Sequence, residues 1–117
     1  MNHLDQVARR NALGGERTID LRWFRIELEQ QRSFRLDQLR DLSYEAAAAS
    51  DEALSEVTSE LMTGARTVLA EIDAALFRLA IGSFGICQRC GRAIPVDRLE
   101  VLPMASLCLP CQYATEQ

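Results

Sequence analysis

Two short stretches, Cys87-Gln-Arg-Cys90 and Cys108-Leu-Pro-Cys111, decide the fold of the last third of this chain. Seventeen residues separate the two pairs, and the sequence has no other cysteine. A C-x-x-C turn presents two thiolates to one ion, and Zn²⁺ binds four thiolates at about 2.3 Å in tetrahedral geometry. We therefore predict one zinc ion held by these four cysteines. Four protein ligands leave no position for water or substrate, so the predicted site is structural and not catalytic.

Two disulfides or a redox-active pair are the alternatives to zinc for the four cysteines. Two disulfides would require an oxidising compartment, but Met1–Gln6 has neither the charged nor the apolar part of a signal peptide. We therefore expect a cytoplasmic location and reduced thiols. A redox-active C-x-x-C pair belongs to a βαβ pattern that the surrounding residues lack. Gly91 favours the metal, because a metal-binding turn often needs a positive φ where it ends.

Composition and charge exclude several functions. The chain has 117 residues, a formal net charge of −4 and all its basic side chains as arginine. An acidic chain has the wrong sign for neutralising phosphates, so we expect no specific binding to DNA. No run of eighteen apolar residues is present, which excludes a membrane span in the sequence. The only histidine is His3, and no catalytic constellation is recognisable, so we do not expect an enzyme.

Two long helices are predicted ahead of the cysteines. The first covers about Glu16 to Ala49, and the second covers Asp51 to Ile81 with Ser50 as its N-cap and Gly82 as its end. Apolar residues recur at intervals of three or four, which predicts one apolar stripe on each helix. The stripes consist of Leu21, Phe24, Leu28, Leu36, Leu39 and Leu42, and of Leu54, Val57, Leu61, Ala65, Val68, Ile72, Ala75 or Leu76, and Leu79.

The predicted fold is mainly α: a long antiparallel two-helix coiled-coil hairpin with a small C-terminal four-cysteine module like a zinc ribbon. We expect a mobile arm at residues 1–15, the hairpin at 16–82 with its tip at about 44–52, and the zinc module at 83–117. A compact bundle, or a four-helix bundle with a second copy, is the alternative. Trp23 and Phe24 are expected to pack against either the zinc end or the second helix.

The segment 75–112 resembles the zinc finger of the DksA/TraR family. The resemblance lies in Phe84-Gly85-Ile-Cys87, in Cys90-Gly91, in Ile94 followed by Arg98-Leu99, in Pro103, and in the C-x2-C-x17-C-x2-C spacing. It implies a transcription regulator that binds RNA polymerase directly and does not contact DNA. It also implies that the hairpin enters the secondary channel of the polymerase while the zinc end rests on the outer rim.

This resemblance gives roles to residues of the tip and of the zinc end. The family carries an Asp-x-x-Asp-Ala motif at the tip, and this chain lacks it. Asp51, Glu52 and Ala53 are the nearest chemical counterparts, and Tyr44 and Glu45 complete the expected tip. Arginines near the zinc make that end locally basic, and they either pair with nearby carboxylates or dock on an acidic rim. The three expected at the rim are Arg89, Arg92 and Arg98.

Two further functional classes share these sequence features. One is a zinc-stabilised adaptor whose hairpin binds a different protein, and the other is a redox or zinc sensor whose thiolates release metal on oxidation. The resemblance leaves open whether a nucleotide effector such as ppGpp cooperates and whether the net effect is activation or repression.

Overall fold

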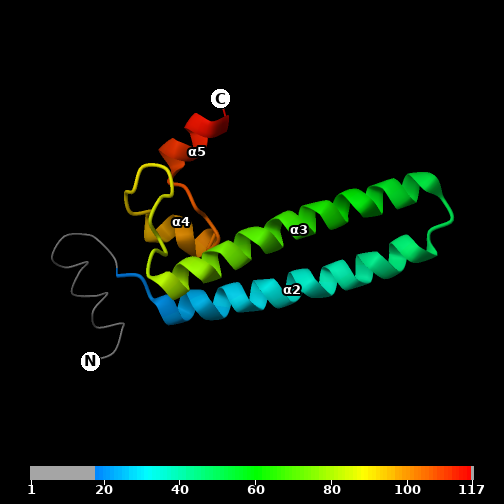
Figure 1. Ribbon diagram of the computed structural model, residues 1–117, viewed down its shortest axis with the longest axis horizontal. Coiled ribbons are helices and arrows are strands. Elements are labelled where there is room, and N and C mark those ends of the chain that lie inside the picture. The colour runs from blue at the N-terminus through cyan, green and yellow to red at the C-terminus, as the bar shows by residue number, and fades with distance from the viewer. Residues whose placement is uncertain (1–17, 117) are drawn as a thin grey trace.

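The computed structural model describes residues 18–116, and helices account for most of them (Figure 1). Two long helices, α2 (Leu21–Ala48) and α3 (Glu52–Ile81), are followed by two short ones, α4 (Val96–Val101) and α5 (Leu109–Glu116). The β pairing in this part of the chain is an isolated antiparallel bridge between Ile86 and Ala93. The predicted fold class is confirmed. The arm expected at residues 1–15 lies outside the described residues.

Helices α2 and α3 form an antiparallel hairpin that dominates the shape of the molecule. In Figure 1 they run side by side, joined at one end by residues 49–51, while α4 and α5 lie at the opposite end. The molecule measures 61 by 37 by 22 Å along its principal axes, so it is elongated. Midway along the hairpin, Arg32 Nε donates to Asp73 Oδ1 at 2.7 Å across the two helices. The compact bundle considered from the sequence is therefore not adopted.

The first helix begins later than predicted. It starts at Leu21, and Asp20 is its N-cap, with its side chain accepting a hydrogen bond from the Trp23 amide at 3.0 Å. Such a cap satisfies one of the amides that a helix start leaves unpaired. Residues 18–20 are not helical, and residues 16 and 17 lie outside the described part of the chain. The sequence pattern alone did not distinguish Asp20 as the cap.

The ends of α3 correct one prediction and confirm another. Asp51 is the N-cap, not Ser50, because the Asp51 carboxylate accepts from the Ala53 amide at 2.9 Å. At the other end Gly82 has φ 83°, and the Ser83 amide donates to the Arg78 carbonyl at 2.9 Å. This left-handed ending is the one that glycine adopts without steric cost, and the prediction for Gly82 is confirmed.

The contact line between the long helices differs from the apolar stripe read in the sequence. On α3 the buried positions Thr58, Ala65, Ile72 and Leu79 recur every seven residues, as in a coiled coil. Leu54, Val57 and Leu61, which the sequence assigned to that seam, are 54%, 53% and 52% exposed. On α2 the predicted seam residues Leu21 and Leu36 are also exposed. The predicted stripes are therefore wrong at these positions.

A difference in period explains this error. The apolar residues of α3 follow the 3.6-residue period of a straight helix, whereas the contact line of the pair follows 3.5 residues per turn. The two lines separate by roughly 20° per heptad. They coincide near the zinc end, at Ile72 and Leu79, and they have diverged at the level of Thr58.

The hydrophobic core lies where the hairpin meets the cysteine module. Phe24 and Leu28 of α2 pack with Ile72, Ala75 and Leu79 of α3. The same cluster includes, from the module, the buried side chains of Phe84, Cys87, Ile94, Leu99 and Cys108. Phe24 thus contacts the zinc end, one of the two placements expected for it. This shared core fixes the cysteine module on the base of the hairpin.

Candidate functional site: a four-cysteine metal centre on a helical hairpin

The first cysteine pair lies in a tight turn built by backbone hydrogen bonds. The Cys87 amide donates to the Arg92 carbonyl at 2.8 Å, and the Gly91 amide donates back to the Cys87 carbonyl at 2.9 Å. Gly91 has φ 76°, as predicted from its place after the second cysteine. Gly85 has φ 84°, and a Cβ there would lie 2.6 Å from Ile19 Cδ1, so a side chain cannot be accommodated without a shift. These glycines let the chain turn twice within a few residues.

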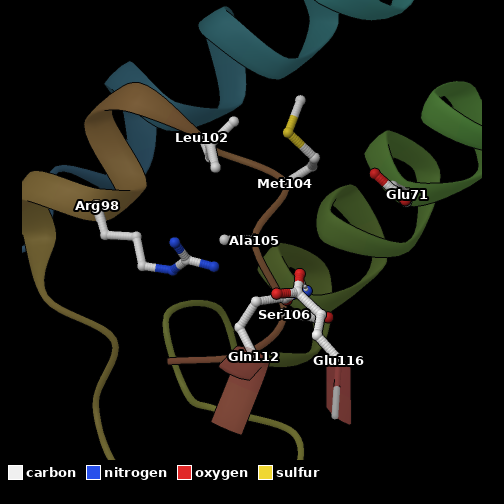
Figure 2. Close-up of a pocket in the computed structure, with 8 residues that line it drawn as sticks. All are labelled: Glu71, Arg98, Leu102, Met104, Ala105, Ser106, Gln112 and Glu116. Carbon is white, nitrogen blue, oxygen red and sulfur yellow. Dashed lines mark hydrogen bonds between the residues drawn. The ribbon is translucent and has the colours of Figure 1, made fainter. Parts of the chain in front are cut away.

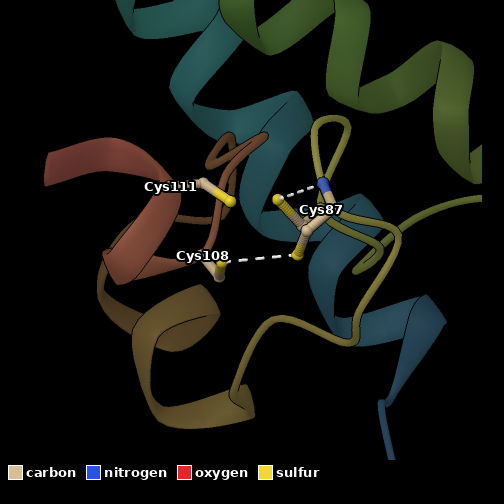
Figure 3. Close-up of side chains that lie close together, drawn as sticks. Cys87, Cys108 and Cys111 are labelled. Carbon is tan, nitrogen blue, oxygen red and sulfur yellow. Dashed lines mark hydrogen bonds between the residues drawn. The ribbon is translucent and has the colours of Figure 1, made fainter. Parts of the chain in front are cut away.

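The four thiols converge on one point (Figure 3). The sulfur atoms of Cys87, Cys90, Cys108 and Cys111 all lie within 4.8 Å of one another, and none is in a disulfide. The Cys90 and Cys108 sulfurs are 3.7 Å apart. Four sulfurs at about 2.3 Å from one zinc in tetrahedral geometry would be about 3.8 Å apart, so the cluster fits the ion. The Cys90 amide also points at the Cys87 sulfur, at 3.5 Å.

The clustered thiols differ in their acid–base properties. Hydrogen bonding from the Cys90 backbone, opposed by burial and supported by the backbone at Cys108 and Arg89, lowers the pKa of Cys87 to about 5. The hydrogen bond with the Cys108 side chain, burial and the other neighbouring thiols raise the pKa of Cys111 to about 12. One thiolate therefore forms readily, whereas the ionisation of a further thiol is opposed by its neighbours. A divalent cation removes that opposition.

The arginines of this end hold the cysteine module together through backbone carbonyls. Arg98 Nε donates to the Leu107 carbonyl at 3.0 Å, and Arg78 Nη2 reaches the Met104 carbonyl at 3.5 Å. Arg89 Nη1 lies 3.5 Å from the Cys111 carbonyl. Arg78 is 8% exposed, and burial lowers its pKa. The sequence suggested carboxylates or a rim as partners and missed these carbonyls, because no sequence pattern marks a tertiary contact to a loop.

Arg92 differs from these three side chains. Its side chain lies exposed in the turn after Cys90 and makes no hydrogen bond or ion pair with the described residues, whereas its backbone carbonyl accepts from the Cys87 amide. Among the arginines expected at the rim, it is the one whose guanidinium has no hydrogen-bond partner among the described residues.

The tip residues lie at the end of the hairpin farthest from the cysteines. Tyr44 and Glu45 are in the last turns of α2, and Asp51 and Glu52 are at the start of α3, all of them exposed. Because the Asp51 carboxylate caps α3, one of its oxygens is already used within the chain. The four expected tip residues therefore lie at the same end of the hairpin, two on each side of the connection between α2 and α3.

An open cavity of about 410 Å³ lies between α3, α4 and α5 (Figure 2). Its charged lining consists of Arg98, Glu71 and Glu116, and Figure 2 shows these side chains on three different elements. Arg98 already donates to Leu107, and Glu116 accepts from Gln112 at 2.8 Å. Two carboxylates, with one guanidinium that is already hydrogen-bonded, do not favour a phosphate-rich ligand.

Among the described residues, no helix is both long enough and apolar enough to cross a bilayer.

These features define a class of protein: a four-cysteine zinc finger carried at the base of an elongated helical hairpin. The family model for the prokaryotic dksA/traR C4-type zinc finger matches residues 82–117. The transcription factor DksA2 from Pseudomonas aeruginosa has the same fold, with a TM-score of 0.72, 30% sequence identity and 82% of each chain covered. The chain therefore belongs to the DksA/TraR family, and its cofactor is a structural zinc ion.

Curated relatives share the same segment. The RNA polymerase-binding transcription factor DksA from Haemophilus influenzae is 39% identical over 51 residues, which are 44% of this chain and 35% of the relative. The protein of the same name from Caulobacter vibrioides is 34% identical over 77 residues, which are 66% of this chain and 52% of the relative. The matched part thus spans about a third to a half of the length of these relatives.

Proposed function

We propose that this protein regulates transcription by binding RNA polymerase directly, with its hairpin in the secondary channel and its zinc module on the channel rim. The observation that carries the proposal is the arrangement of the parts. An acidic tip and a zinc module lie at opposite ends of one rod, and the family match lies at the zinc end. Its place of action is then the cytoplasm, where polymerase works, and it performs no catalysis itself.

The hairpin is long enough to carry the tip far from the zinc module. Helix α3 has 30 residues, which gives a length of about 45 Å at 1.5 Å per residue. The zinc module is rigidly joined to the hairpin by the shared core, so docking at the base sets the position of the tip. A rigid connection lets binding energy from one end orient the other.

Charge supports a protein partner in preference to DNA. Residues 41–65 contain Asp41, Glu45, Asp51, Glu52, Glu56 and Glu60 and no basic residue. This part of the rod would be repelled by a phosphate backbone. The exposed Arg92 at the other end offers one positive charge to an acidic rim.

Binding of the zinc-loaded protein to purified core RNA polymerase tests the proposal, measured by fluorescence anisotropy of labelled protein. A duplex DNA fragment of random sequence, titrated under the same salt conditions, is the control. We expect saturable binding to polymerase and no specific retention on DNA. Absence of polymerase binding by folded, zinc-loaded protein would favour the adaptor function instead.

A further inference from the structure

Three large aliphatic side chains lie on one side of the distal half of α3 without a partner in the hairpin. Leu54, Val57 and Leu61 are each more than half exposed, although the large apolar residues of an amphipathic helix usually face the core. At about 100° per residue, Leu54 and Leu61 lie roughly 40° and 60° from the buried Thr58, and Val57 lies on the same side of it. We refer to Leu54, Val57 and Leu61 as the lateral strip.

The contact between α2 and α3 near the tip is made by residues other than the lateral strip. Near the tip the seam is formed by Thr58 and Ala65, which are 2% and 3% exposed. Small residues in the seam leave the larger side chains beside it, where they face solvent. At about 100° per residue, Glu60 lies about 60° from Val57 and borders the strip, whereas Glu56 lies on the far side of the helix. The lateral strip is thus an apolar surface in a strongly acidic setting.

A second copy of this chain is a poor occupant for the strip. Pairing two strips would bring together two segments that each carry six carboxylates between residues 41 and 65, and only Arg40 beside Asp41 offsets one of them. Three aliphatic side chains also bury only a few hundred Å², whereas a stable interface buries about 800 Å² per partner. Both the charge and the area argue against self-association through this face.

We propose that the lateral strip docks on a surface of RNA polymerase where apolar side chains are bordered by Arg or Lys. This inference rests on the proposed function, since polymerase is the partner. The occupant must be basic because opposite charges at the border of an apolar contact set orientation and suppress wrong partners. It must be apolar at its centre because the strip gains affinity when Leu54, Val57 and Leu61 are removed from water. The strip then contributes affinity along the side of the rod, separately from the loop at its end.

The test compares three variants with the wild type for binding to core polymerase. The strip variant carries Leu54→Gln, Val57→Gln and Leu61→Gln. The control variant carries Phe77→Gln and Ile81→Gln, which change two equally exposed apolar residues at the opposite end of the same helix. The border variant carries Glu60→Gln, which removes the carboxylate next to Val57. Because all of these side chains are exposed, each variant should retain its zinc and its helical circular dichroism signal.

We expect the strip variant to bind at least roughly 30-fold more weakly, which is the effect of losing one interface hot spot. The border variant should bind more weakly at low salt and approach the wild type as salt rises. The control variant should bind at least ten times more tightly than the strip variant. Wild-type affinity in the strip variant would overturn the inference and leave the proposed function standing. Failure of the wild type to bind polymerase would overturn both the proposed function and this inference. A stable dimer in sedimentation that the strip variant dissociates would overturn the inference alone.

Discussion

Phe24 of α2 lies against Phe84 of the cysteine module, with ring centroids 5.1 Å apart and planes inclined by 46°. The two rings are sixty positions apart in sequence, so this contact exists only when the hairpin has closed. Both side chains are buried in the core that joins the two parts of the molecule. The contact therefore couples the folding of the zinc end to that of the hairpin.

Replacing Phe24 by Ala should destabilise the whole molecule. A buried phenylalanine cut back to alanine typically costs about 3–5 kcal/mol, a large part of the stability of a domain of this size. Urea denaturation followed by circular dichroism measures the loss. Trp23→Ala is the matched control, because Trp23 is adjacent in sequence but 41% exposed, and it should cost much less. Equal losses for the two variants would show that the Phe24 contact has no special weight.

Removing one thiolate should empty the metal site and unfold the cysteine module. We expect one zinc per chain in the wild type and none in Cys108→Ser, measured by elemental analysis of the purified protein. Structural zinc contributes about 10–16 kcal/mol of apparent folding free energy in small peptides, which the core of this module cannot replace. The long helices should remain partly helical in circular dichroism. Stoichiometric zinc in the variant would contradict the four-cysteine assignment.

Arg98 and Arg92 should separate stability from binding. Arg98→Ala removes the hydrogen bond to the Leu107 carbonyl, and hydrogen bonds from charged groups contribute about 1.5–3 kcal/mol. We expect that loss in thermal or urea unfolding. Arg92→Ala should leave stability unchanged, because the side chain is exposed, and should weaken binding to polymerase if Arg92 docks on an acidic rim. A destabilised Arg92→Ala with normal affinity would reverse this assignment.

The acidic tip should control transcription output more than affinity. The sharpest variant is Asp51→Asn with Glu52→Gln, because Asn is as good an N-cap as Asp and keeps the start of α3 intact while both charges are removed. We expect altered output in transcription by purified polymerase, with binding within a few-fold of the wild type. Asp51→Ala is the informative comparison, since it also removes the cap and should cost about 1 kcal/mol of stability. Unchanged output in both variants would remove the tip from the proposed mechanism.

The sequence was most informative where chemistry is local. Two C-x-x-C turns need only their own few residues to present sulfur, so Cys87, Cys90, Cys108 and Cys111 could be assigned to one ion before their positions were known. The ending of α3 at Gly82 was likewise predictable, because a left-handed residue is set by its own backbone. Two long amphipathic segments were enough to predict the hairpin.

Only the tertiary structure decided which faces of those helices meet. Periodicity placed Leu54, Val57, Leu61 and Ala65 in one stripe, and Ala65 is buried as predicted. The pairing of the helices placed Thr58 in the seam and left Leu54, Val57 and Leu61 in solvent. Only the fold, too, gave Arg78 and Arg98 their carbonyl partners on the loop before Cys108. The reason is the same in both cases. A local pattern specifies whether a side chain is apolar or can donate a hydrogen bond, whereas the pairing of distant segments decides which neighbour it contacts.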